Sequence, residues 1–114
     1  MSHSLLDEGL LSSYLNHLGK DIIKQMIELY QQQSKIYLDD ISRAVNAQST
    51  FLWQEHCHKM KGAAGTVGLK VLHRYLMTIE KSAALSEDKS LMIISLKQHN
   101  DLGIAALIGW LNAV

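Results

Sequence analysis

The sequence predicts an all-α protein, an antiparallel four-helix bundle with a short additional N-terminal helix. Three observations support this fold class. The 114 residues include no proline, which would interrupt a helix. Apolar residues make up 47% of the chain and recur at helical spacing. No segment shows the alternation of a β-strand. The length suits a single domain that spans residues 1–114.

The first predicted helix spans residues 4–17, with leucines along one side. Gly19 is placed to end it, because glycine adopts the left-handed conformation at low cost. The second helix, over residues 20–47, has the clearest pattern, since its apolar residues form one stripe and its charged residues lie elsewhere.

Three further helices are predicted over residues 50–68, 69–85 and 87–112. Each begins near a residue that can cap a helix or follows a glycine that can end one. The expected caps and stops are Ser49 or Thr50, Gly68 and Ser86.

Charge and cysteine content exclude several classes of protein. Eleven Lys and Arg residues balance eleven Asp and Glu residues, which argues against nucleic-acid binding. Cys57 is the only cysteine, so no internal disulfide can form and a reducing compartment is expected. No stretch is long and apolar enough to span a bilayer, and the first residues lack the layout of a signal peptide, so no direct membrane contact is expected.

Residues 56–70, HCHKMKGAAGTVGLK, raise the question of a metal or phosphate site. On a helix, His56 and His58 point about 200° apart and cannot ligate one ion, so no metal site is expected. Neither the Walker phosphate loop nor the dinucleotide-binding pattern G-x-G-x-x-G fits Gly62, Gly65 and Gly68, and no strand precedes these glycines.

A helix through this segment places His58 on its exposed face, opposite an apolar stripe that includes Trp53 and Cys57. Gly62 lies one turn beyond His58. A helical glycine costs about 1 kcal/mol relative to alanine, and the gain expected here is close access to the imidazole. Lys59 and Lys61 flank this face and can steady an anion. The other residues expected on the exposed face are Phe51, Gln54, Glu55, Gly65 and Leu69.

The pattern H-x-x-K-G-A-A-x-x-V-G resembles that of the histidine-containing phosphotransfer (Hpt) domain. It is formed here by His58, Lys61, Gly62, Ala63, Ala64, Val67 and Gly68. The stretch HKMKGAAGTVGL resembles in particular the modules at the C-terminal ends of tripartite hybrid sensor kinases, near the anaerobic-respiration sensors and the trimethylamine-N-oxide type.

This resemblance implies that His58 accepts a phosphoryl group on Nε2 from a receiver-domain aspartate and passes it to another receiver. Lys61 and Lys59 would screen the phosphoryl charge, and Gly62 would clear space for it. The receiver would supply Mg²⁺, so the module would need no cofactor of its own and would not be a catalyst by itself. It would be a cytoplasmic monomer, either free-standing or the C-terminal module of a membrane-bound sensor kinase, and the exposed face would dock receivers.

Glu80 falls where the family often has a glutamine near the other nitrogen of the histidine. Its carboxylate would either hold the Nδ1–H tautomer of His58 or simply be a solvated charge. Among the remaining histidines, His56 is expected to be partly buried. The others, His3, His17, His73 and His99, are expected at the surface.

Two alternative functions present a similar helix. The dimerisation domain of a histidine kinase would continue H-E-x-R-x-P after its histidine, whereas Lys59 and Met60 follow His58 and the chain has no proline. The other alternative is a structural or metal-binding bundle, which would take up no phosphoryl group.

Overall fold

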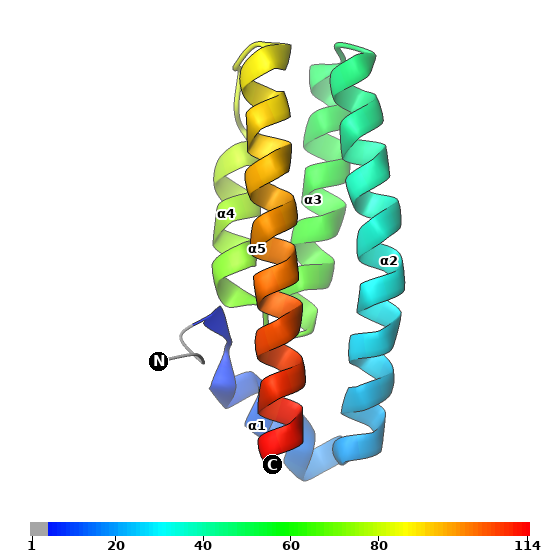
Figure 1. The fold of residues 1–114 in the computed structure, drawn as a ribbon, viewed down its shortest axis with the longest axis vertical. Helices are drawn as coiled ribbons and strands as arrows, with labels where there is room; N and C mark the ends of the chain where they lie inside the picture. The colour runs from blue at the N-terminus through cyan, green and yellow to red at the C-terminus, as the bar shows by residue number, and fades with distance from the viewer. Residues whose placement is uncertain (1–4) are drawn as a thin grey trace.

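The structure, a computed structural model, describes residues 5–114. Over this range the chain forms α-helices and no β-strand (Figure 1). None of these helices is long and apolar enough to cross a membrane. In chain order they are α1 (Glu8–Leu18), α2 (Lys20–Asn46), α3 (Thr50–Thr66), α4 (Lys70–Glu80) and α5 (Ser86–Ala113).

Helices α2 to α5 form the bundle, and each runs antiparallel to the helix before it (Figure 1). Helix α3 contacts both α2 and α4, and α5 closes the bundle by contacting α2 and α4. Helix α1 lies at the lower end, where it contacts α2. The predicted antiparallel four-helix bundle with a short additional N-terminal helix is therefore confirmed.

Side-chain caps fix the starts of α1 and α3. The Asp7 carboxylate accepts a hydrogen bond from a backbone N–H of the first turn at 3.1 Å, so α1 begins at Glu8. The predicted start at residue 4 lies outside the described residues. The Ser49 hydroxyl likewise accepts a first-turn N–H of α3 at 3.1 Å. Each cap satisfies a donor that the helix itself leaves free.

Two glycines in the left-handed region break the chain between helices. Gly19 has φ 85° and separates α1 from α2, and Gly68 has φ 83° and follows α3. Helix α3 ends at Thr66, two residues before the predicted end at residue 68. Gly68 also meets the N-terminal segment, because its carbonyl accepts the Asp7 N–H at 2.8 Å.

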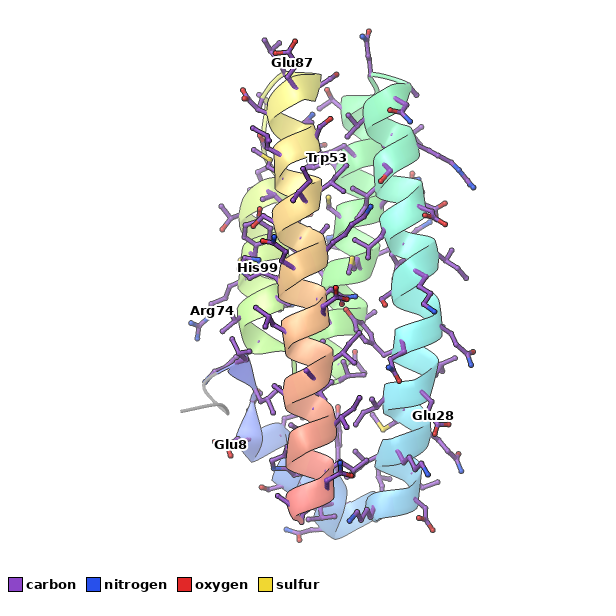
Figure 2. The ribbon with its side chains drawn as sticks, viewed as in Figure 1. Glu8, Glu28, Trp53, Arg74, Glu87 and His99 are labelled. Atoms are coloured by element: carbon purple, nitrogen blue, oxygen red, sulfur yellow. The ribbon has the colours of Figure 1, made fainter. Side chains whose placement is uncertain are left out.

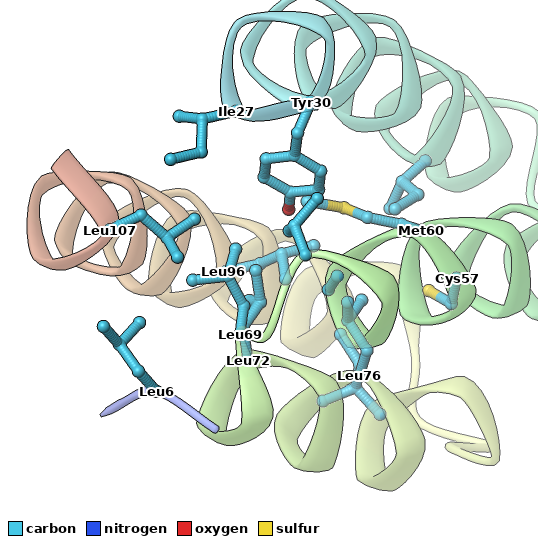
Figure 3. Close-up of a cluster of buried hydrophobic side chains, with 14 of the residues drawn as sticks. Leu6, Ile27, Tyr30, Cys57, Met60, Leu69, Leu72, Leu76, Leu96 and Leu107 are labelled. Carbon is cyan, nitrogen blue, oxygen red and sulfur yellow. The ribbon is translucent and has the colours of Figure 1, made fainter. Parts of the chain in front are cut away.

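The prediction that Leu69 belongs to the exposed face of α3 is wrong. Leu69 is 0% exposed and lies in the apolar core (Figure 3). It packs so closely on α5 that a Cβ added at Gly103 would lie 2.9 Å from its Cδ2 atom. The prediction failed because Leu69 follows the left-handed Gly68, where the rotation of about 100° per residue no longer applies.

The connection between α4 and α5 also differs from the prediction. Helix α4 ends at Glu80, and residues 81–85 form a loop instead of continuing the helix to residue 85. In this loop the Ser82 hydroxyl accepts the Ala84 N–H at 3.1 Å, a local bond that competes with helix formation. Ser86 is the first residue of α5 rather than its cap, and no side chain caps this helix.

A buried polar chain links α2 and α5 within the apolar core. Tyr30 donates its hydroxyl to the Asn100 side-chain oxygen at 2.7 Å. The Asn100 amide then donates to the Ser34 hydroxyl at 3.1 Å. Because each buried group has a partner, the network avoids the cost of an unsatisfied polar atom. The neighbouring apolar residues labelled in Figure 3 include Ile27, Met60, Leu72, Leu76, Leu96 and Leu107.

Replacing Gly68 with alanine should destabilise the fold. A Cβ there would lie 3.0 Å from the Leu11 side chain, and the alanine would have to adopt the left-handed backbone conformation of Gly68. We expect Gly68→Ala to lower the free energy of unfolding by about 1–2 kcal/mol in urea denaturation. The control is Gly109→Ala in α5, where a Cβ meets nothing within 4 Å. That change should raise stability by up to about 1 kcal/mol. Equal effects of the two substitutions would contradict this account of Gly68.

Candidate functional site

His58 lies on the outward face of α3, and its side chain is 69% exposed. Trp53, Cys57 and Met60 of the same helix are buried, as the predicted apolar stripe requires. The burial of that stripe against the bundle turns His58 toward solvent. The imidazole is thus available to another molecule while its backbone is held by a packed helix.

Glu80, the last residue of α4, binds the inner nitrogen of His58. The Nδ1 atom lies 3.3 Å from Oε2 of Glu80. Because a carboxylate can only accept, the proton resides on Nδ1 and the Nε2 lone pair faces outward. The Glu80 side chain is only 11% exposed, so it is not a solvated surface charge. The geometry decides between the two possibilities that the sequence left open.

The other oxygen of Glu80 pairs with Lys61. The Lys61 ammonium donates to Oε1, and its side chain is 18% exposed. Burial raises the pKa of the Glu80 carboxyl, but the hydrogen bonds and charges of Lys61 and then of His58 outweigh it. The pKa therefore lies below its ordinary value of 4.5, and Glu80 is ionised at neutral pH.

Both lysines expected to steady an anion are engaged by carboxylates. Lys61 is held by Glu80 beneath His58. Lys59 lies 3.6 Å from Glu55 in an exposed pair one turn apart on α3. Such exposed pairs contribute little to stability, so Lys59 can leave Glu55 at small cost. Lys61, half-buried and bound more closely, is part of the fixed site.

The two glycines on this face have different roles. A Cβ at Gly62 would meet nothing within 4 Å, which matches the expected open access beside His58. A Cβ at Gly65 would lie 3.0 Å from Nδ1 of His73. Gly65 is therefore half-buried against α4 rather than open like Gly62, and its part in receiver docking stays a prediction. Its small size allows the His73 ring to pack on α3.

His73 was expected at the surface, but it is half-buried and joins α4 to α3. Its Nδ1–H donates to the Lys61 carbonyl at 3.0 Å. His99 is also half-buried, and its ring stacks on Tyr75 with centroids 4.6 Å apart (Figure 2 labels His99). The sequence showed only two isolated histidines, and neither contact could be found without the packing of α4 on α3 and α5.

The other histidines and Cys57 do not join the site. His56 is half-buried, as expected, with Nδ1 4.0 Å from Asp40 Oδ2, whereas His17 is exposed. His3 lies outside the described residues. Cys57 is 0% exposed, and burial and the nearby Glu80 charge raise its thiol pKa to about 12, so it acts as a core residue. In residues 5–114, no three His, Cys, Asp or Glu side chains gather as a metal-binding group.

The remaining residues of the predicted docking face lie on the outer side of α3. Phe51 is 71% exposed, Gln54 is exposed and Glu55 is half-buried. With His58 and Gly62 they form a continuous strip along the helix. We call the strip formed by Phe51, Gln54, Glu55, His58, Lys59 and Gly62 the outer face of α3.

Comparison with known proteins bears directly on this arrangement. The family model described as the Hpt domain matches residues 25–106. The aerobic respiration control sensor protein ArcB of Escherichia coli K12 is 33% identical over 73 residues, which is 64% of this chain and 9% of the sensor. ArcB of Shigella flexneri gives the same identity and coverage. The match thus spans a small part of these relatives.

Two solved structures resemble the fold over nearly its whole length. The histidine-containing phosphotransfer domain of ArcB from E. coli has a TM-score of 0.86 and 26% identity, and the match covers 98% of this chain and 97% of that one. A solution structure of the same domain of the anaerobic sensor kinase ArcB has a TM-score of 0.83 and 26% identity, with 97% and 90% covered.

Substitution of Glu80 should make stability depend on pH in a defined direction. Because folding lowers its pKa, Glu80 contributes stability above the ordinary value of 4.5, and this contribution is lost as pH falls through the lowered value. We expect Glu80→Gln to unfold more easily than the wild type at pH 7, and the difference to shrink toward pH 3. Urea denaturation over this range measures it. Glu28→Gln, an exposed change within α2, is the control and should show no such trend. A difference that grows on acidification would contradict the ion pair.

Proposed function

The chain belongs to the Hpt domain family, and from this membership we propose that His58 is the residue that accepts and passes on a phosphoryl group in a two-component phosphorelay. One observation carries the assignment. His58 is exposed at the centre of the outer face of α3, and its Nδ1–H is held by Glu80. The free Nε2 lone pair then points at an incoming partner, as a nucleophile requires.

The transfer step follows from this geometry. Nε2 of His58 attacks the phosphorus of an aspartyl phosphate on a receiver domain. The N–P bond forms, the P–O bond to the aspartate breaks, and the carboxylate leaves with the electron pair. Nδ1 keeps its proton, so the ring becomes positive, and the ionised Glu80 facing it stabilises that charge. Transfer to a second receiver runs the same step in reverse.

We place the remaining chemistry on the partner. The receiver is expected to supply the Mg²⁺ that neutralises the phosphoryl oxygens, and this domain acts as a monomeric, positioned nucleophile without a cofactor. Since its relatives are sensor proteins, we propose that it works as the phosphotransfer module of a hybrid sensor kinase, on the cytoplasmic side of the membrane.

Loss of His58 should abolish phosphoryl uptake without unfolding the protein. We expect the His58→Gln variant to take up no label from a receiver domain phosphorylated with ³²P, because the nucleophile is removed. Its circular dichroism should match the wild type, since the side chain is 69% exposed. His56→Gln is the control and should be labelled normally. Acid-labile, base-stable label on the His58→Gln variant would refute the assignment.

A bulky residue at Gly62 should slow transfer while it stabilises the helix. A side chain there enters open space beside His58 and blocks the approach of a receiver. We expect Gly62→Gln to reduce the transfer rate by about tenfold or more, and to raise the free energy of unfolding by up to about 1 kcal/mol. Gly109→Gln, equally open but on α5, should give the same stabilisation with a normal rate. Unchanged transfer in Gly62→Gln would remove the access argument.

Receiver docking should depend on Phe51. This side chain is 71% exposed on the same side of α3 as His58, and an apolar residue next to a reactive group is typical of a transient interface. We expect Phe51→Ala to weaken receiver binding by about tenfold while phosphorylation by phosphoramidate stays normal. Leu91→Ala, 65% exposed on α5, is the matched control. Receiver-induced NMR shifts centred on α5 would contradict this docking face.

A further inference from the structure

A pocket lies at the upper end of the bundle, where α3 begins. The α2–α3 turn and the loop between α4 and α5 both lie at this end (Figure 1). Helix α4 has 11 residues, whereas α5 has 28. Beside the start of α5 the chain therefore forms the loop over residues 81–85 and not a further turn of α4. The pocket has a volume of about 340 Å³, at the lower end of the range of about 300–1,000 Å³ for small-molecule sites.

Lys89 of α5 lines this pocket and is only 6% exposed. Its ammonium lies 5.1 Å from the centre of the Trp53 ring, which forms another wall (Figure 2 labels Trp53). Within residues 5–114, Lys89 makes no ion pair and no side-chain hydrogen bond. A cation–π contact replaces only part of the hydration of an ammonium, so an anion in the pocket would give Lys89 a charge partner that it lacks among the described residues.

Several polar groups at or near the pocket are already engaged. The Ala44 and Val45 carbonyls at the end of α2 accept backbone N–H groups of the α2–α3 turn at 3.0 Å each. The Ile79 carbonyl accepts the Trp53 indole N–H at 2.8 Å. Glu80 is held by Lys61 and His58. Lys89 donates a hydrogen bond to none of these acceptors.

The rest of the lining is mixed, and the polar residues Gln48, Ser49, Thr50 and Ser86 stand beside apolar ones. Helix α5 begins at the pocket with no side-chain cap, so its first N–H groups and the positive end of its dipole face this region. Apolar walls come from Ala44, Val45, Trp53 and Leu85, and Leu85 is 75% exposed at the rim. Glu87 and Asp88 in the same turn are exposed and pair with nothing in the described chain.

We propose that this pocket binds a small organic carboxylate, whose anionic group pairs with Lys89 and whose hydrocarbon part packs on Trp53. The site is separate from the phosphoryl-accepting face and does not depend on the proposed transfer function. A carboxylate fits better than inorganic phosphate, because one ammonium and one helix start balance a single charge, and because the Trp53 ring, whose N–H is already bonded, can pack on hydrocarbon but gives a phosphate no hydrogen bond.

Butyrate is a suitable probe, and binding can be followed by ¹H–¹⁵N NMR and calorimetry on the whole chain. We expect saturable shifts of the Trp53 indole N–H and of amides in residues 83–89, with a Kd on the order of millimolar. The neutral isostere butan-1-ol, butylammonium and inorganic phosphate should each bind at least about tenfold more weakly. This comparison requires no variant and cannot be confused with misfolding.

Lys89→Met removes the charge but keeps a side chain of similar length, and should weaken butyrate binding at least about tenfold. Lys97→Met, an exposed change on the same helix, should leave it unchanged. His58→Gln should also bind butyrate normally, which separates this site from phosphotransfer. The proposal is overturned by non-saturable shifts, by shifts centred on other residues, by butan-1-ol or phosphate binding as tightly as butyrate, or by full binding in Lys89→Met.

Discussion

The Glu80 carboxylate, at the end of α4, binds His58 on the outer face of α3 and the half-buried Lys61 of the same helix. One oxygen fixes the tautomer of His58 and the other neutralises Lys61, so a single side chain at the end of α4 sets the state of two residues on α3. Removing the carboxylate would leave a half-buried ammonium without its counter-charge and would let the imidazole rotate. Because partly buried ion pairs gain little net stability, the arrangement is better explained by the geometry that it imposes on His58.

That geometry requires α3 and α4 to lie close together, and two further contacts between these helices hold them. The Trp53 indole N–H binds the Ile79 carbonyl at 2.8 Å near the upper end of α4. Toward the other end, His73 packs on Gly65 and binds the Lys61 carbonyl at 3.0 Å. Any residue larger than glycine at position 65 would push the His73 ring away. Gly65 therefore serves the helix spacing, whereas Gly62 serves access.

The helices and the exposed position of His58 could be predicted because both follow from a period within one element. Leu69 could not, since its direction is set by the left-handed Gly68 and the closeness of Gly103 on a distant helix. Local composition also gave no sign of the end of α4, because residues 81–85 contain neither glycine nor proline. Glu80 could be placed near His58 by resemblance, but its bond to Lys61 required the three-dimensional structure. Contacts between helices are the part of the site that periodicity does not encode.

The charges of the site bear on the proposed phosphoryl transfer. Glu80 and Lys61 cancel each other, and Lys59 is offset by Glu55, so the surroundings of His58 carry no net charge to hold a phosphoryl group. A phosphoryl group adds between one and two negative charges at neutral pH. Among the described residues, the positive ring of the phosphorylated His58, stabilised by Glu80, offsets part of this charge. Under the proposed function, further neutralisation comes from a cation that the docked partner brings, and it is lost when the partner leaves. A domain built in this way can carry a phosphoryl group between partners without stabilising it so strongly that the second transfer fails.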